Sequence, residues 1–67
     1  MYFKRLAELR IDNDLTQKRL SEMLEMNRET YQRYEAGTRE IPVWLLIKLS
    51  SLYRVSTDYI LGLTDQR

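Results

Sequence analysis

The side chains best suited to chemistry in this sequence lie in one short stretch near the middle of the chain. Tyr31 and Tyr34 fall three positions apart, so on a helix both face the core, while Arg28, Gln32 and Arg33 point the other way. Arginine and glutamine carry donors that match the edges of guanine and adenine in the major groove of DNA. A merely solvated helix face has a similar composition. The stretch therefore allows either reading, and the rest of the sequence must decide between them.

The residue types that are missing argue against catalysis. The 67 residues include no histidine and no cysteine. This removes the commonest general acid or base near neutral pH, the commonest metal ligand and any thiolate nucleophile. Carboxylates remain, but a domain of this size rarely carries a deep pocket that shifts their pKa values. We therefore expect no enzyme activity, no metal, no cofactor and no small-molecule ligand.

Length and charge set further bounds. A chain of 67 residues suits one domain with one modest core, so we expect a single domain over residues 1–67. Eleven basic and ten acidic residues give a net charge of +1, too small to indicate nucleic-acid binding by itself. The segment Met1–Arg5 is no signal peptide, and no apolar run approaches membrane-spanning length. Together with the absence of cysteine, this indicates a cytoplasmic protein.

The elements that must position these side chains are helices. Only two glycines and one proline interrupt a chain rich in helix-forming residues, which predicts an all-α fold. The first helix carries Phe3, Leu6 and Leu9 on one face and should stop within Asp12–Asp14, leaving Ile11 off the stripe. The remaining helices are expected at Gln17–Leu24, Arg28–Ala36, Val43–Tyr53 and Thr57–Leu61.

Capping residues set the limits of these helices. Thr16, Asn27 and Ser56 are expected to accept hydrogen bonds from the first turn of the helix that follows each of them. Gly37 and Gly62 can end helices in the left-handed conformation. Each cap agrees with the apolar spacing beside it.

Two helices carry further expectations about burial. In Gln17–Leu24 the buried stripe is expected to be Leu20, Met23 and Leu24, and Pro42 is expected to be the first residue of the fourth helix. The fourth helix is apolar nearly all the way round. It is therefore either central and buried or provided with a second contact face. Its apolar residues are Val43, Trp44, Leu45, Leu46, Ile47, Leu49 and Leu52.

Two short amphipathic helices joined by a tight turn form a helix-turn-helix layout, which is weakly specific because many helical bundles contain it. The details are more specific. The segment from Leu15 to Pro42 reads LTQKRLSEMLEMNRETYQRYEAGTREIP and resembles the Cro- and lambda-repressor-like, or XRE-type, helix-turn-helix family of bacteria and phages. The resemblance continues through Val55–Leu63. It rests on Leu15-Thr16-Gln17, Leu20, Leu24, Tyr34-Glu35, Gly37 and Pro42.

The resemblance implies a five-helix lambda-repressor-like domain that binds double-stranded DNA sequence-specifically as a repressor-like transcriptional regulator. The helix Arg28–Ala36 would then lie in the major groove. The positions of the family's base-reading residues correspond here to Arg28, Glu29 and Arg33, with Thr30 and Asn27 as lesser candidates. Contacts to the DNA backbone are expected from Gln17, Lys18, Gln32, Thr38 and Arg39.

The resemblance also implies two structural features. Family members pair charges at the positions of Arg10 and Glu35, so we expect a salt bridge between these residues. The family often has glycine in the turn between the second and third helices, where this chain has Glu25. A residue with a side chain would then be held at positive φ, at a cost of about 1 kcal/mol.

Helix-turn-helix proteins usually dimerise, so that two recognition helices reach half-sites about 34 Å apart. We therefore expect a homodimer on a palindromic operator. Pairing through the C-terminal helix, as in the family, would involve Thr57, Tyr59 and Ile60, and Trp44 is a further candidate for which core packing stays equally open. The main alternative function is a protein-interaction module, such as an antitoxin-like or accessory regulatory partner.

Overall fold

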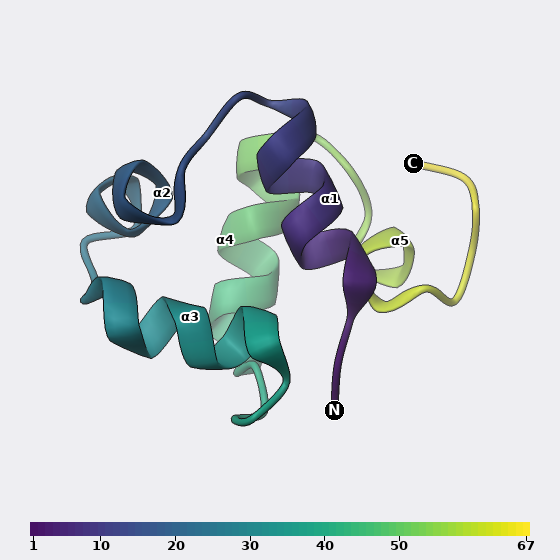
Figure 1. Cartoon of the computed structure of the whole chain (residues 1–67). Helices are drawn as coiled ribbons and strands as arrows, with labels where there is room; N and C mark the ends of the chain where they lie inside the picture. The colour runs from purple at the N-terminus through teal and green to yellow at the C-terminus, as the bar shows by residue number, and fades with distance from the viewer.

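Five helices follow one another along the chain, and the computed structural model, which describes residues 1–67, contains no strand (Figure 1). The predicted all-α fold is confirmed. The predicted helix limits agree with the structure except at two places: the second helix stops one residue earlier, and Pro42 lies just before the fourth helix. The helices are α1 Lys4–Asp12, α2 Gln17–Met23, α3 Arg28–Ala36, α4 Val43–Tyr53 and α5 Thr57–Leu61.

The helices enclose a single core. Helix α2 packs on α3, α4 packs on α5, and α1 packs on both α3 and α5. In Figure 1 α4 runs through the middle of the molecule, with α3 crossing near its N-terminal end. None of the five helices has the length and apolar character needed to cross a membrane. The buried hydrophobic residues come from all five helices, the turn after α2 and the loop before α5, and they are Leu6, Leu9, Leu20, Leu24, Tyr31, Tyr34, Leu45, Leu46, Leu49, Val55 and Ile60.

Side-chain caps begin three of the helices, as predicted. The Oγ1 of Thr16 accepts from the Arg19 amide at 3.0 Å, and the Oδ1 of Asn27 accepts from the Glu29 amide at 2.8 Å. Ser56 caps α5 in the same manner. The expectation for Pro42 is off by one position: its ψ of 154° is extended, so it precedes the helix and α4 begins at Val43.

A left-handed residue follows every helix, although the chain has only two glycines. After α2, the amides of Glu25 and Met26 donate to the carbonyls of Glu22 and Ser21 at 3.1 and 2.9 Å, the paired closure of a Schellman motif. The φ of Glu25 is +56°, which confirms the expected strain in this turn. The five left-handed residues are Asp14, Glu25, Gly37, Arg54 and Gly62. Three of them carry a side chain and each costs about 1 kcal/mol.

Burial in α2 differs from the sequence expectation. Met23 is 40% exposed, whereas Ser21 is buried and donates from its hydroxyl to the Lys18 carbonyl at 2.8 Å. The reason is helical geometry, because Leu20, Ser21 and Leu24 share one face and Met23 lies roughly 100° from its centre. The expected exposure of Ile11 is confirmed, since 60% of its surface is accessible.

Helix α4 was expected to be either buried or provided with a second contact face, and the structure shows a buried side and an exposed apolar side. Leu45, Leu46 and Leu49 are buried in the core. Val43 and Trp44, on the opposite side, are 70% and 54% exposed, and Ile47 lies exposed with them. The helix therefore has a second apolar face that no part of this chain covers.

Candidate DNA-binding surface

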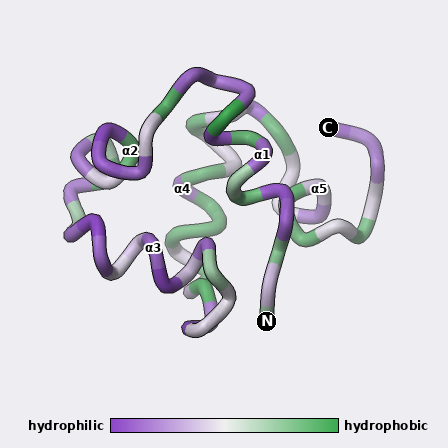
Figure 2. Tube along the Cα trace, viewed as in Figure 1, coloured by the Kyte–Doolittle hydropathy of each residue, from purple (hydrophilic) through white to green (hydrophobic).

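Helix α3 has two sides of opposite character. Tyr31, Tyr34 and Glu35 are buried on the inner side. The outer side is polar, and α3 is mostly hydrophilic along its length where α4 is mostly hydrophobic (Figure 2). Its exposed side chains are Arg28, Glu29, Gln32 and Arg33, with Thr30 half-buried at the flank. None of these five forms a side-chain hydrogen bond or ion pair within the chain, so their polar groups are free for a ligand.

A buried ion pair fixes the inner side of α3. The Arg10 Nη2 lies 2.9 Å from Glu35 Oε1, and Arg10 Nε lies 3.1 Å from Glu35 Oε2, so the guanidinium binds both carboxylate oxygens. The two side chains are only 15% and 7% exposed. A bidentate arrangement has one preferred geometry, and it therefore sets the rotation of α3 relative to α1.

The same ion pair extends to the second helix. Arg10 Nη1 donates to the Leu15 carbonyl at 2.8 Å, in the turn that leads into α2. From α2, the side-chain amide of Gln17 donates to Glu35 Oε1 at 3.2 Å. Glu35 is thus held by side chains from both preceding helices. The Glu35 carboxylate therefore connects α3 to both α1 and α2.

The titration behaviour of this network follows from its contacts. Burial acts to raise the pKa of Glu35, but its hydrogen bonds, led by that from Arg10, outweigh burial and hold the pKa below its ordinary value. The hydrogen bonds that Arg10 donates to Glu35 likewise raise the pKa of Arg10, against the opposing effect of burial. The pair is therefore fully charged at neutral pH.

Two tyrosine hydroxyls border the network. Those of Tyr31 and Tyr53 are buried and have no hydrogen-bond partner. Burial and the charge of Glu35 raise the pKa of Tyr31, and raise that of Tyr53 to about 12. Both tyrosines therefore stay neutral beside the ion pair.

Comparison with known proteins decides which family has this arrangement. Residues 6–60 match the model of the helix-turn-helix family, which spans all but the ends of the chain. The chain belongs to this XRE-like helix-turn-helix family of DNA-binding transcriptional regulators. The resemblance stated from the sequence is thereby confirmed, and with it the lambda-repressor-like class of the fold.

Curated relatives from Bacillus subtilis (strain 168) agree with the family. The chain is 45% identical over 65 residues to the uncharacterized HTH-type transcriptional regulator YobD, covering 97% of this chain and 58% of YobD. It is 44% identical over 59 residues to the HTH-type transcriptional regulator ImmR, covering 88% of this chain and 46% of ImmR. The chain thus spans about half the length of the curated relatives it matches.

In this helix-turn-helix chain, the residues expected at the DNA backbone fall into two groups. Lys18, Gln32 and Arg39 are exposed, and their side-chain donors are free. Gln17 already donates to Glu35, and the Thr38 hydroxyl donates to the Arg33 carbonyl at 3.3 Å. The last two must share or exchange a hydrogen bond before they can bind a phosphate. The sequence carried no signal for either internal contact.

The residues expected at a dimer interface are also divided. Ile60 is only 1% exposed, so the expectation that its side chain contacts a second copy is wrong: its place on α5 turns it into the core. The ring of Tyr59 is covered by the guanidinium of Arg5, 3.9 Å from its centroid, with that of Arg67 at 5.4 Å. Thr57 is half-buried, and Trp44 stands exposed on α4.

Proposed function

We propose that residues 1–67 act as one DNA-binding domain that recognises a specific double-stranded sequence, with α3 in the major groove, for a repressor-like transcriptional regulator in the cytoplasm. The supporting observation is the outer face of α3. Arg28, Gln32 and Arg33 keep all their side-chain donors free there, while Glu35 and Tyr31 hold the inner face. Base reading requires such donors on a helix of fixed orientation.

Each residue on the outer face has a distinct role in this proposal. Arg28 and Arg33 each donate two hydrogen bonds to a guanine, one to O6 and one to N7. Glu29 accepts from the amino group of cytosine, and because its charge repels phosphates it acts through discrimination more than affinity. The Oδ1 of Asn27 is used in the helix cap, which leaves its amide group as a donor to a base edge. Thr30 contacts the flank of the same site.

Phosphate contacts hold α3 in register. Lys18, Gln32 and Arg39 supply free donors around the recognition helix. Gln17 and Thr38 join them by exchanging an internal hydrogen bond for one to a phosphate. These contacts carry no sequence information but set affinity and its dependence on salt.

The proposed assembly on DNA is a homodimer at a palindromic operator, because one recognition helix contacts only a half-site. The apolar outer face of α4 supports pairing through Trp44, with Val43 and Ile47 beside it. Thr57 and Tyr59, both half-buried on α5, extend the interface in this proposal. Burying such a face in a dimer contributes about 25 cal/mol of favourable free energy for each Å² of apolar surface removed from water.

Selection from random DNA duplexes tests the proposal. We expect an enriched palindromic motif, with half-site centres about one helical turn apart, and an affinity that falls steeply with salt. Recovery of no motif, together with affinity that does not change between 50 and 200 mM salt, would overturn it.

The second candidate function is a protein-interaction module, such as an antitoxin-like or accessory regulatory partner. The observation that favours it is the same exposed apolar face of α4, which a protein other than a second copy can also cover. Binding through this face depends on apolar burial and is nearly independent of salt. The two functions are separated by substitutions on α3, which affect only DNA binding.

A further inference from the structure

The first residues of the chain cross the end of the recognition helix. The Met1 nitrogen donates to the carbonyl of Gly37 at 3.3 Å. A Cβ placed on Gly37 would lie only 2.9 Å from the Cα and the Cβ of Tyr2, closer than real Cβ atoms come to other atoms. The N-terminal end of the ribbon accordingly lies beside the turn after α3 (Figure 1). We call residues Met1–Phe3 the strap.

The turn under the strap is the segment that carries Arg39. On its inner side, the amides of Thr38 and Arg39 both donate to the Arg33 carbonyl, at 3.1 and 3.3 Å. The contact with Tyr2 described above adds a second restraint, at Gly37. The turn is therefore held both by the Arg33 carbonyl of the recognition helix and by the backbone of the strap.

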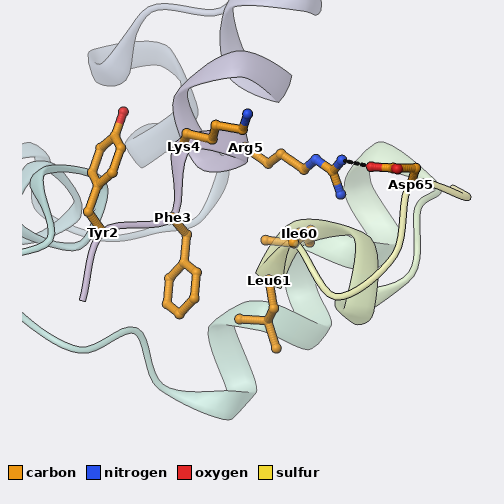
Figure 3. Close-up of a pocket in the computed structure, with 8 residues that line it drawn as sticks. Tyr2, Phe3, Lys4, Arg5, Ile60, Leu61 and Asp65 are labelled. Atoms are coloured by element: carbon orange, nitrogen blue, oxygen red, sulfur yellow. Dashed lines mark hydrogen bonds and ion pairs between the residues drawn. The ribbon is translucent and has the colours of Figure 1, made fainter.

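The strap is itself anchored at its other end. Phe3 is half-buried, packs against the core and has an extended backbone, so it directs the preceding residues away from α1. Arg5 then ties the first turn of α1 to the opposite end of the chain, by bonds to the carbonyls of Tyr59 and Thr64 and an ion pair with Asp65 at 2.7 Å (Figure 3). In Figure 3 the Phe3 ring extends toward Leu61, on the side away from Tyr2.

We propose that the strap is a positioning element for DNA binding: Tyr2, through its backbone contact with Gly37, holds the turn after α3 so that Arg39 meets a phosphate. This inference rests on the proposed function. Because phosphate contacts carry no sequence information, loss of the strap weakens binding to every sequence and leaves the preferred motif unchanged. The strap touches no base in this proposal.

The two glycines provide a matched test of the contact. Gly37 and Gly62 both have left-handed φ angles, of 81° and 79°, so Ala costs about the same backbone strain at each. Only at Gly37 does the new Cβ meet the strap, since nothing lies within 4 Å of it at Gly62. We expect Gly37→Ala to lower the melting temperature more than Gly62→Ala. In a synthetic chain that begins at Phe3, this excess should vanish. An equal loss at both glycines in the full chain would overturn the contact.

A double-mutant cycle with Arg39 tests the function. Removing Met1 and Tyr2 should lower the affinity for the selected duplex and for an unrelated duplex alike, by about two- to fivefold, the effect of one exposed charged contact. The slope of log affinity against log salt should fall in magnitude by about 1. In an Arg39→Ala background the same truncation should have no further effect. A loss of equal size in both backgrounds would show that the strap does not act through Arg39.

The charge of the amino group is tested separately with the full chain acetylated at Met1. We expect this chain to bind like the unmodified one, because the strap remains in contact with Gly37. If acetylation reproduces the loss caused by truncation, the charge acts directly and the positioning role is wrong. Failure of the unmodified chain to select any DNA motif would instead count against the proposed function, so the two failures are distinguishable.

Discussion

Two helix faces of this protein point away from the core, and they differ in what exposure costs them. The outer face of α3 is polar, and its arginines and glutamine are stable in water without a partner. The outer face of α4 is apolar, with Val43 70% exposed beside Trp44 and Ile47. Exposing apolar surface to water costs free energy in proportion to its area. The first face suits a ligand whose binding weakens with salt, and the second suits association through burial.

The inner sides of the same two helices differ as well. Beneath α3 lies a bidentate ion pair with one preferred geometry, Arg10 with Glu35. Beneath α4 lie Leu45, Leu46 and Leu49, whose contacts are not directional. The helix proposed to read bases is thus the one whose orientation is specified by directional bonds. The ion pair fixes the orientation of α3, whereas the leucines stabilise α4 through the apolar area that they bury.

The largest expected effect comes from removing the support under α3. Arg10→Met leaves Glu35 buried without its partner and should lower the free energy of unfolding by up to about 3–5 kcal/mol, and by less to the extent that water reaches the carboxylate. Arg19→Met is the matched control, because Arg19 pairs only with exposed Glu22 at 3.7 Å. Denaturation in the absence of DNA measures both. Equal stabilities for the two variants would contradict the role given to the ion pair.

The apolar face is tested by Trp44→Ser. If Trp44 lies at the centre of a homodimer interface, its removal should weaken dimerisation by at least about 2 kcal/mol, as at other interface hot spots. Ile11→Ser removes an exposed apolar side chain of α1 and should leave the dimer intact. Sedimentation equilibrium at low and high salt gives the dissociation constants. A monomeric parent chain, or equal effects of the two substitutions, would rule out this interface.

The polar face is tested by Arg28→Ala and Arg33→Ala. Each should reduce affinity for the selected motif by about 1–3 kcal/mol and relax the preference at one base pair per half-site. Arg54→Asn removes the same charge at the far end of α4, and asparagine tolerates the left-handed backbone found there. This control should leave the motif unchanged. An identical motif for all three variants would remove the base-reading roles.

Acid should weaken the support under α3. The pKa of Glu35 is lower in the folded chain than in the unfolded chain. Its contribution to stability is therefore complete above the unfolded pKa, near 4.5, and is lost as the pH falls through the lower folded pKa. The slope contributed by this one group is at most about 1.4 kcal/mol per pH unit. Glu35→Gln should lack this part of the dependence, measured by denaturation between neutral and acidic pH. Parallel profiles for the two chains would contradict the prediction.

The smallest effect is expected in the turn that joins α2 and α3. Glu25 has a φ of +56°, and Glu25→Gly relieves this strain while increasing the entropy of the unfolded chain. The opposing effects are each about 1 kcal/mol, so the variant should be neutral to slightly stabilised. Glu8→Gly, in the regular helix α1, should destabilise by about 1 kcal/mol. Equal losses of melting temperature at both positions would contradict the prediction.

The sequence by itself determined the helices and, to within one residue, their limits. Thr16, Asn27 and Ser56 cap the helices that follow them, and apolar spacing set the buried side of α3. These signals act within a few residues and are therefore readable along the chain. The family resemblance was also sufficient to foresee the positive φ of Glu25.

Only the tertiary structure decided which side chains stay free for a partner. Ile60 is turned inward, Gln17 donates to Glu35, and Tyr59 is covered by Arg5, although the family resemblance had implied a contact with DNA or a second copy for each of them. The contact between Tyr2 and Gly37 was equally unforeseen. Such contacts join residues far apart in the chain, and their partners depend on how whole helices cross. No spacing rule within one helix contains that information.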